Sequence, residues 1–233
     1  MKDTIYFKQA KLLLQVLPSI DKTNCFALKG GTAINFFHRD MPRLSVDIDL
    51  TYLPINTREE ALADISKSLK HIGSLVTKEL GARVDEINLS GTDKTVKLQV
   101  RYQGATIKVE PNVVIRGSLF PPYPADLRPK AVEMFELSVT TTVLSVPDLY
   151  GGKICAALDR QHPRDFYDVR FLLDNEGLTD DVRQAFLVFL ASHDRPMHEL
   201  LRPKLKDMRQ VYENEFKGMT VEPVEFVSAG RKV

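Results

Sequence analysis

A glycine pair followed by two closely spaced aspartates has the residue types and spacing needed to bind phosphate and metal. Gly30–Thr32 follows the short apolar run Phe26–Leu28, and Asp47 and Asp49 are separated by a single residue. Glycine lets the backbone approach a ligand closely, and the N–H groups at the start of a helix attract anions. Two neighbouring carboxylates repel each other unless a cation lies between them, and their oxygens favour Mg²⁺ or Mn²⁺.

Each half of this pattern also has a purely structural explanation, as a turn or as a solvated strand edge. The order of the halves favours the functional one, because Thr32–Phe37 has a helical pattern and Ser45–Leu50 is typical of a strand. Side chains alternate along a strand, so Asp47 and Asp49 should point the same way while Ile48 points to the core. The sequence therefore predicts a phosphate-binding turn, a short helix and a strand that carries a metal site.

Glu110 is a third carboxylate with a suitable position. Phosphoryl and nucleotidyl transfer need metal ions that bridge phosphate oxygens and a correctly placed nucleophile. Glu110 follows the predicted strand 105–109 and faces the same side as Lys108. If this strand neighbours Asp47 and Asp49, Glu110 would complete the metal site or accept a proton from the attacking hydroxyl. The alternative is an exposed glutamate at a strand end.

A second cluster of candidate residues lies further along the chain. Lys153 follows Gly151 and Gly152, which leave one helix face thin enough for a ligand or strand to approach. A lysine in such a place is suited to a triphosphate contact. Asp165 lies in the first turn of a helix that opens at Pro163, where the helix dipole favours a carboxylate. It is therefore either a helix cap or a functional residue.

Composition narrows the class of protein. The 233 residues allow one large domain or two small ones, and the net charge of +1 gives no overall attraction to nucleic acid. Cys25 and Cys155 are too few for a disulfide framework and have apolar neighbours, which indicates buried thiols in a reducing compartment. No apolar run approaches the roughly 18 residues needed to cross a bilayer. The start of the chain also lacks the apolar core of a secretory signal. We expect a cytoplasmic protein without membrane contact.

The elements that position these residues follow from periodicity and turn signals. A capping box at Thr57–Glu60 opens a long helix that ends near Gly81, and the strands after it have the spacing of a β-meander. The proline-rich segment 120–124 is expected to leave the sheet. The predicted helices are 5–17, 57–80, 147–158, 163–173, 181–192 and 202–216, and the predicted strands of the meander are 83–89, 95–102 and 105–109.

These elements predict an α+β fold with a small mixed sheet in front and a helical bundle behind. We place an α/β domain with the phosphate and metal motifs at residues 1–118. A mainly helical domain at residues 119–233 would complete the active site.

Five segments together resemble one known family. They are Lys29–Ala33, Arg43–Leu50, Lys108–Glu110, Lys153 and Arg164–Asp168. In this order they resemble the AbiEii/AbiGii (MenT-like) nucleotidyltransferase toxin family, over about residues 25–173 of the chain. The spacer between the glycines and the aspartates is longer than in many polymerase-β-type enzymes, but the Arg-x-Ser-x-Asp-x-Asp form suits this branch.

The resemblance implies a polymerase-β-like nucleotidyltransferase sheet with a C-terminal helical bundle. It implies a bacterial toxin of a toxin–antitoxin or phage-defence pair that uses an NTP with Mg²⁺ (or Mn²⁺) and has a cognate antitoxin. Related toxins transfer nucleotides to the tRNA 3′ end, which blocks aminoacylation and translation. The site residues it implies are Lys29, Gly30, Gly31, Thr32, Arg43, Ser45 and Lys153 for the nucleotide, Asp47, Asp49 and Glu110 for metal, and Asp47, Asp49, Glu110, Lys153 and Asp165 for catalysis. Asp168, one helical turn beyond Asp165, is the alternative for the last role.

Other functions remain open on the sequence alone. The same catalytic residues could modify a protein or a small molecule, and a nucleotide-binding module without activity is a third reading. Intact Asp47, Asp49, Lys153 and Asp165 argue against that module. An RNA acceptor would be met by basic residues, namely Arg116, Arg128, Lys130, Arg160, Arg164, Arg170, Arg202, Lys204, Lys206 and Arg209.

Overall fold

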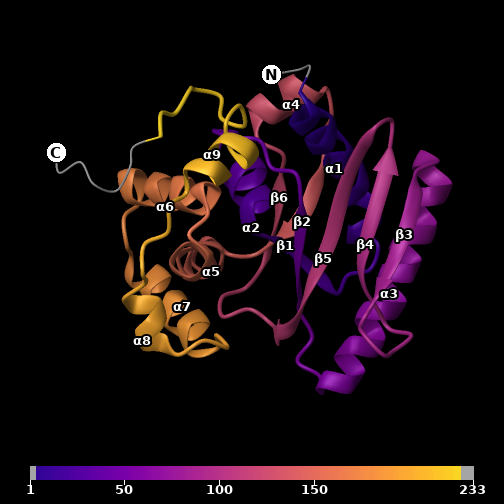
Figure 1. Ribbon diagram of the computed structural model, residues 1–233. Helices are drawn as coiled ribbons and strands as arrows, with labels where there is room; N and C mark the ends of the chain where they lie inside the picture. Colours follow the sequence, from indigo (N-terminus) through magenta and orange to yellow (C-terminus); the bar gives the residue numbers. More distant parts are fainter. Residues whose placement is uncertain (1–3, 227–233) are drawn as a thin grey trace. The chain divides into compact units, whose positions relative to one another are not determined.

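The computed structural model describes residues 4–226 and is shown in Figure 1. The chain forms two compact units, Met1–Ser145 and Val146–Val233. The division falls later than residue 118, where the sequence analysis places it, because residues 119–145 add two strands to the sheet of the first unit. Part of the chain start, on which the expectation of no secretory signal rests, lies outside the described residues.

A seven-stranded mixed sheet is the centre of the first unit. Its strand order is β3-β4-β5-β2-β1-β7-β6. β2 runs parallel to β5, and β1 runs parallel to β7, while the other neighbouring pairs are antiparallel. The predicted meander is thereby confirmed for β3, β4 and β5. The strands are β1 (Phe26–Lys29), β2 (Ile48–Tyr52), β3 (Arg83–Asn88), β4 (Thr95–Tyr102), β5 (Ala105–Arg116), β6 (Tyr123–Asp126) and β7 (Thr140–Val143).

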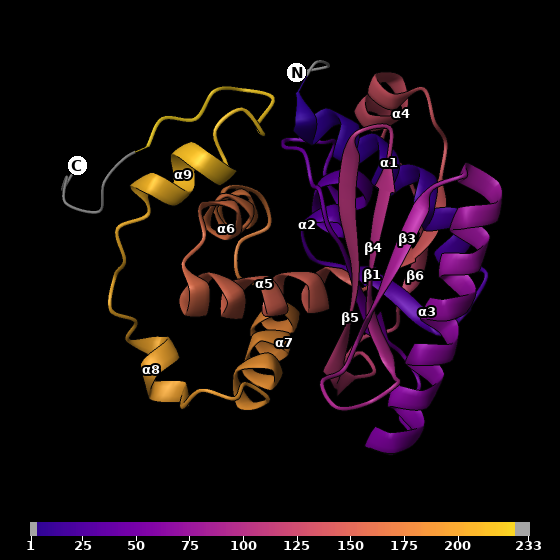
Figure 2. The ribbon, with the colours of Figure 1, turned by 45° about the vertical axis from the view of Figure 1, so that its right-hand side comes forward.

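The longest helix of this unit, α3 (Arg58–Leu80), begins and ends as the sequence predicts. The Thr57 hydroxyl accepts a hydrogen bond from the Glu60 N–H, and the Glu60 carboxylate accepts one from the Thr57 N–H. Gly81 ends the helix in the left-handed conformation, with φ of 65°. Figure 2 shows α3 lying along one face of the sheet. The other regular helices of the unit are α1 (Ile5–Asp21), α2 (Gly30–Thr32) and α4 (Pro129–Phe135), and α2 continues into the π-helical segment η1 (Ala33–His38).

Apolar side chains fill the space between the sheet and α3. A side chain at Gly73 of α3 would touch Leu98, which marks the sheet face that α3 covers. Ile48 and Leu98 are both paired with Val109 in the sheet, and all three side chains are fully buried. Burial of each such side chain stabilises the fold by roughly 1.5–3 kcal/mol. Because strand residues alternate, the intervening positions of β2, β4 and β5 face the opposite side of the sheet.

Two predictions about this unit need correction. The first helix extends four residues beyond the predicted end at residue 17, through Pro18 to Asp21, and Ile20 beyond the proline is buried. The proline-rich segment does not leave the sheet, since its end pairs with β7 as the edge strand β6. Pro124 is tolerated there because an edge strand has one side without a neighbouring strand.

The second unit is helical, with α5 (Val146–Arg160), α6 (Pro163–Asn175), α7 (Asp180–Ala191), α8 (Met197–Leu201) and α9 (Arg209–Glu215). The first three confirm the predicted helices to within a few residues. The predicted helix 202–216 is wrong, because only its last part is helical. The Gln161 side-chain amide donates to the Lys204 carbonyl and accepts from the Lys206 N–H, both at 2.9 Å. The Gln161 side chain, just after α5, thus pairs with backbone groups that a helix would have paired, and residues 203–208 are irregular.

Within residues 4–226, no helix combines the length and the apolar character that crossing a membrane requires.

Candidate active site

The chain turns from β1 into α2 at Gly30, and this turn requires glycine at that position. Gly30 has φ of +70°, a conformation that other residues rarely adopt. A Cβ atom built on Gly30 would lie 2.4 Å from Oδ2 of Asp49 on β2. The glycine therefore allows the backbone of the turn to lie directly against the carboxylate that the sequence assigns to metal.

Gly31 is equally confined, by a buried arginine. A Cβ atom on Gly31 would lie 2.6 Å from Nη2 of Arg43 and 3.1 Å from Oγ of Ser45. The Arg43 side chain is 2% exposed, and its Nη1 donates to the Leu44 carbonyl at 2.8 Å. Arg43 thus packs beneath the turn and supports it. The backbone of the turn, and not the Arg43 side chain, is the part left to approach a ligand.

Thr32 links the turn to the segment that carries Asp47. Its hydroxyl donates to the Asp47 carbonyl at 2.6 Å and lies 2.9 Å from Oγ of Ser45. Residues 45–47 are not part of the sheet, and β2 begins at Ile48 instead of the predicted Ser45. Asp47 therefore lies just before the strand, and Asp49 lies on it.

Asp49 and Glu110 are direct neighbours across parallel strands. The register pairs Asp49 of β2 with Glu110 of β5, which fulfils the condition on which the metal role of Glu110 rests. Lys29 of β1 lies opposite Asp49 on its other side. Glu110 is not at a strand end as expected, because β5 continues to Arg116. Both acidic residues occupy the sheet face opposite the one that α3 covers.

Lys97 was not foreseen at this site. Its ammonium forms an ion pair with Oε1 of Glu110. A usable signal was present in the sequence, because the Gln103-Gly104 turn sets the register of β4 against β5. The pairing of Tyr102 with Ala105 places Lys97 beside Glu110 five steps further along the hairpin.

The donor set suits a hard divalent cation. Adjacent carboxylates on neighbouring strands provide oxygen ligands of the kind that Mg²⁺ prefers, and the glycine turn leaves room beside them. In the part of the chain that the structure describes, however, no three His, Cys, Asp or Glu side chains converge closely enough to hold a metal. Of the three predicted metal residues, Asp49 and Glu110 are the two that the strand register places side by side, and Asp47 lies just before β2. When bound, such a cation neutralises charge on phosphate oxygens.

The second unit contains a buried ion cluster around Lys153. Its ammonium lies 2.9 Å from Oδ1 of Asp165 and 3.1 Å from Oδ2 of Asp168, and each of the three side chains is at most 5% exposed. Arg160 also binds Asp165, with Nε 2.5 Å from Oδ2 and Nη2 2.9 Å from Oδ1, but its side chain is 61% exposed. Lys153 therefore binds both Asp165 and Asp168, the two alternatives that the sequence offers for the catalytic aspartate. The solvent-facing cation of the cluster is Arg160.

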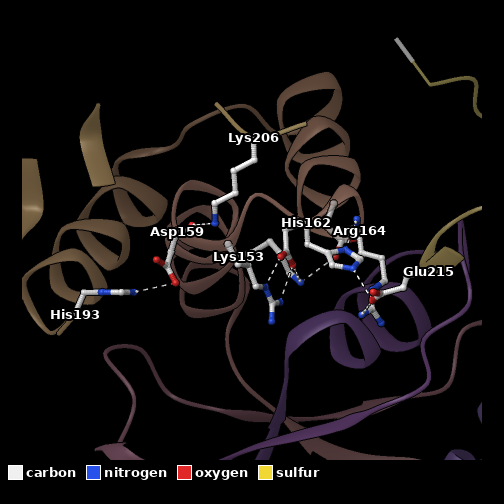
Figure 3. Close-up of polar contacts among 10 residues, drawn as sticks. Lys153, Asp159, His162, Arg164, His193, Lys206 and Glu215 are labelled. Atoms are coloured by element: carbon white, nitrogen blue, oxygen red, sulfur yellow. Dashed lines mark hydrogen bonds and ion pairs between the residues drawn. The ribbon is translucent and has the colours of Figure 1, made fainter. Parts of the chain in front are cut away.

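The charge balance of the cluster keeps Asp165 ionised. Burial alone would raise the pKa of this carboxyl, but the Lys153 ammonium and the Arg160 guanidinium outweigh it and hold the pKa well below its usual range. Asp165 does not cap its helix. His162 does so instead, because its Nδ1 accepts a hydrogen bond from the Arg164 N–H. Figure 3 shows His162 and Arg164 converging on Glu215.

The face of α5 that carries Gly151 and Gly152 packs against residues of α7. A Cβ atom on Gly151 would lie 2.7 Å from the Phe186 nitrogen and 2.8 Å from Ala185, both in α7. The expectation that a ligand or strand approaches this glycine is therefore wrong for Gly151, which permits close packing of α5 against α7. Gly152 has only ordinary contacts with Phe189.

Comparison with known proteins decides the family. The family model described as "Nucleotidyl transferase AbiEii toxin, Type IV TA system" matches residues 11–228. The chain belongs to the AbiEii family. It is accordingly a nucleotidyltransferase enzyme of a toxin family, as the resemblance of its motifs implies.

The solved structure of MenT4 agrees with the α+β fold of this AbiEii-family chain. MenT4, a nucleotidyltransferase toxin from Mycobacterium tuberculosis H37Rv, matches with a TM-score of 0.65 at 15% identity, over 87% of this chain and 73% of MenT4. The antibiotic-resistance factor ANT(2'')-Ia matches with a TM-score of 0.46 at 19% identity, over 79% of this chain and 92% of that one. No curated protein matches the chain in sequence.

Proposed function

We propose that this AbiEii-family enzyme transfers NMP from an NTP to an RNA acceptor, the tRNA 3′ end, and thereby inhibits translation. The observation that carries the transfer chemistry is the pairing of Asp49 with Glu110 beside the Gly30 turn. The tRNA acceptor, and a cognate antitoxin that restrains the enzyme, are inferred from the family resemblance. The proposed setting is the cytoplasm, as part of a toxin–antitoxin or phage-defence pair.

Residues of the first unit would have separate roles in nucleotidyl transfer. The backbone of Gly30 and Gly31 would contact phosphate oxygens, since amides in such a turn favour anions. Thr32 would fix Asp47 relative to this turn through the Asp47 carbonyl. Asp47, Asp49 and Glu110 would hold the divalent cation, and Glu110 would alternatively accept the proton of the attacking hydroxyl.

The second unit would contribute through its buried cluster. By the family resemblance, Lys153 would contact the triphosphate, with Asp165 and Asp168 fixing its ammonium in one position. Arg160 is the more direct candidate for a phosphate contact, because it is the exposed cation bound to Asp165. The remaining basic residues would meet RNA by charge and shape.

The test is transfer of label from each α-labelled NTP, with Mg²⁺, to total bacterial RNA and protein. We expect label in the tRNA band with wild-type enzyme and none with Asp49→Ala. Lys108→Ala, an exposed neighbour on β5, is the matched control and should keep most of the activity. Label in protein or in a small molecule would replace the RNA acceptor, and no label in any fraction would contradict the proposed transfer.

A further inference from the structure

Four charged residues form a row across the sheet, on the face opposite the one that α3 covers. The register places Lys29 beside Asp49 and Asp49 beside Glu110. Lys97 lies beside Glu110 on the neighbouring strand, because Leu98 pairs with Val109 in the antiparallel β4–β5 ladder. The Lys97 ammonium also forms an ion pair with Oε1 of Glu110. The row therefore reads positive, negative, negative, positive across four adjacent strands.

Lys97, at the β4 end of the row, lies where its ammonium can be displaced from Glu110. The side chains of Lys97 and Glu110 are 32% and 33% exposed, so water reaches the ion pair. Partly exposed pairs contribute little to stability, and lysine is a hydrated point charge on a flexible stem. Its ammonium can leave Glu110 without disturbing the core that Leu98 and Val109 form beneath.

We propose that Lys97 is a built-in competitor of the divalent cation at Glu110. The inference rests on the proposed metal site. In the metal-free protein the Lys97 ammonium neutralises Glu110 and offsets the repulsion between Glu110 and Asp49. A divalent cation between these carboxylates meets the positive charge of Lys97 and must push it away. Lys97 is thus a positioning residue that acts through Glu110 and keeps the affinity for metal alone low.

The consequence concerns the order in which ligands assemble. A triphosphate adds negative charge beside the carboxylates and compensates the repulsion from Lys97. The cation should therefore bind well only when the nucleotide is present. Without Lys97, the carboxylates would take up metal alone, and the gain from added nucleotide would shrink.

The experiment measures Mn²⁺ binding to the full chain without nucleotide, by electron paramagnetic resonance of the free ion. Removing one positive charge near a divalent ion in a largely hydrated site should strengthen binding about tenfold in Lys97→Met. Lys97→Arg, which keeps the charge, should bind as the wild type does. Lys108→Met is the matched control, because Lys108 lies on the same face two residues before Glu110, and its effect should be clearly smaller.

A double-mutant comparison shows whether Lys97 acts through Glu110. In the Glu110→Gln background, Lys97→Met should no longer strengthen Mn²⁺ binding as much as it does in the wild type. Unchanged or weaker binding by Lys97→Met alone would overturn the competitor role. Absence of Mn²⁺ binding from the wild type and from every variant would overturn the metal site itself and this inference with it.

Discussion

The charged residues of the candidate site lie in two different environments, one partly exposed and one buried. The Asp49–Glu110–Lys97 group lies on a sheet face and is partly exposed, whereas Lys153, Asp165 and Asp168 are buried together. Exposed charges are solvated by water, so each can lose its partner at little cost in stability. Buried charges lack this solvation and are stabilised by one another. The same substitution, lysine to methionine, should therefore have different consequences in the two places.

Lys153→Met should destabilise the protein strongly. It leaves two buried carboxylates without their shared cation, a loss of about 3–5 kcal/mol in the free energy of unfolding. Arg160→Met is the control: its side chain is largely exposed and Lys153 still neutralises Asp165, so its loss should cost clearly less than the loss of Lys153. Urea unfolding of both variants at neutral pH measures the difference. Equal stability of Lys153→Met and the wild type would show that the cluster is not structural.

Asp165 should also make stability depend on acid pH. Its pKa is lower in the folded protein than the ordinary value of 3.8, so the folded state favours the ionised carboxyl. This contribution is fully present above the ordinary pKa and is lost as pH falls below it toward the folded pKa. One proton taken up on unfolding corresponds to a slope of about 1.4 kcal/mol per pH unit. Urea unfolding from neutral pH down to about pH 3 should therefore show a shallower loss for Asp165→Asn than for the wild type. Parallel curves would contradict this role.

Elements whose signals are local could be predicted from the sequence, and those that depend on distant residues could not. The α3 helix and the β3–β5 meander follow from a capping box and turn glycines within the segments themselves. The irregular residues 203–208 are bound by Gln161, which is remote in sequence. The segment just before β2 is likewise bound by a residue that is remote in sequence, because the Thr32 hydroxyl donates to the Asp47 carbonyl.

The candidate site divides in the same way. Gly30 and Asp49 were recognisable by type and spacing, but their contact depends on how β1 pairs with β2. The sequence makes the role of Glu110 conditional on strand pairing, because no turn fixes the register of β2 against the parallel strand β5. Lys97 is not among the predicted site residues, although the register of the β4–β5 hairpin places it beside Glu110.

The α5–α7 contact offers a test at the level of elements, with two adjacent glycines. Gly151→Ala would place a Cβ against the α7 backbone, which cannot retreat as a side chain would, so we expect a loss of about 1–3 kcal/mol. Gly152→Ala meets only ring atoms at 3.6 Å, and alanine's better helix propensity should make it neutral or stabilising by up to about 1 kcal/mol. Urea unfolding distinguishes the two. A similar effect of both substitutions would contradict the close packing.

At the scale of the whole molecule, each unit has a core of its own with one buried cysteine in it. Cys25 lies in the sheet unit and Cys155 in the helical unit, packed with Leu190 and Leu200. Burial raises the pKa of both thiols, that of Cys155 to about 12. The folded thiols are therefore poor nucleophiles, and reaction with a thiol reagent reports opening of the unit that holds each one.

If the two units open separately, a substitution in one should change the labelling of its own cysteine alone. Gly151→Ala weakens the helical unit and should speed the labelling of Cys155 about tenfold for each 1.4 kcal/mol of opening free energy that is lost, while Cys25 keeps its wild-type rate. Peptide mass spectrometry after timed exposure to a thiol reagent at neutral pH measures both rates in one sample. Gly152→Ala serves as the control and should accelerate neither. Parallel acceleration of Cys25 and Cys155 would mean that the units unfold together, and the AbiEii-family fold would then behave as one cooperative body despite its two cores.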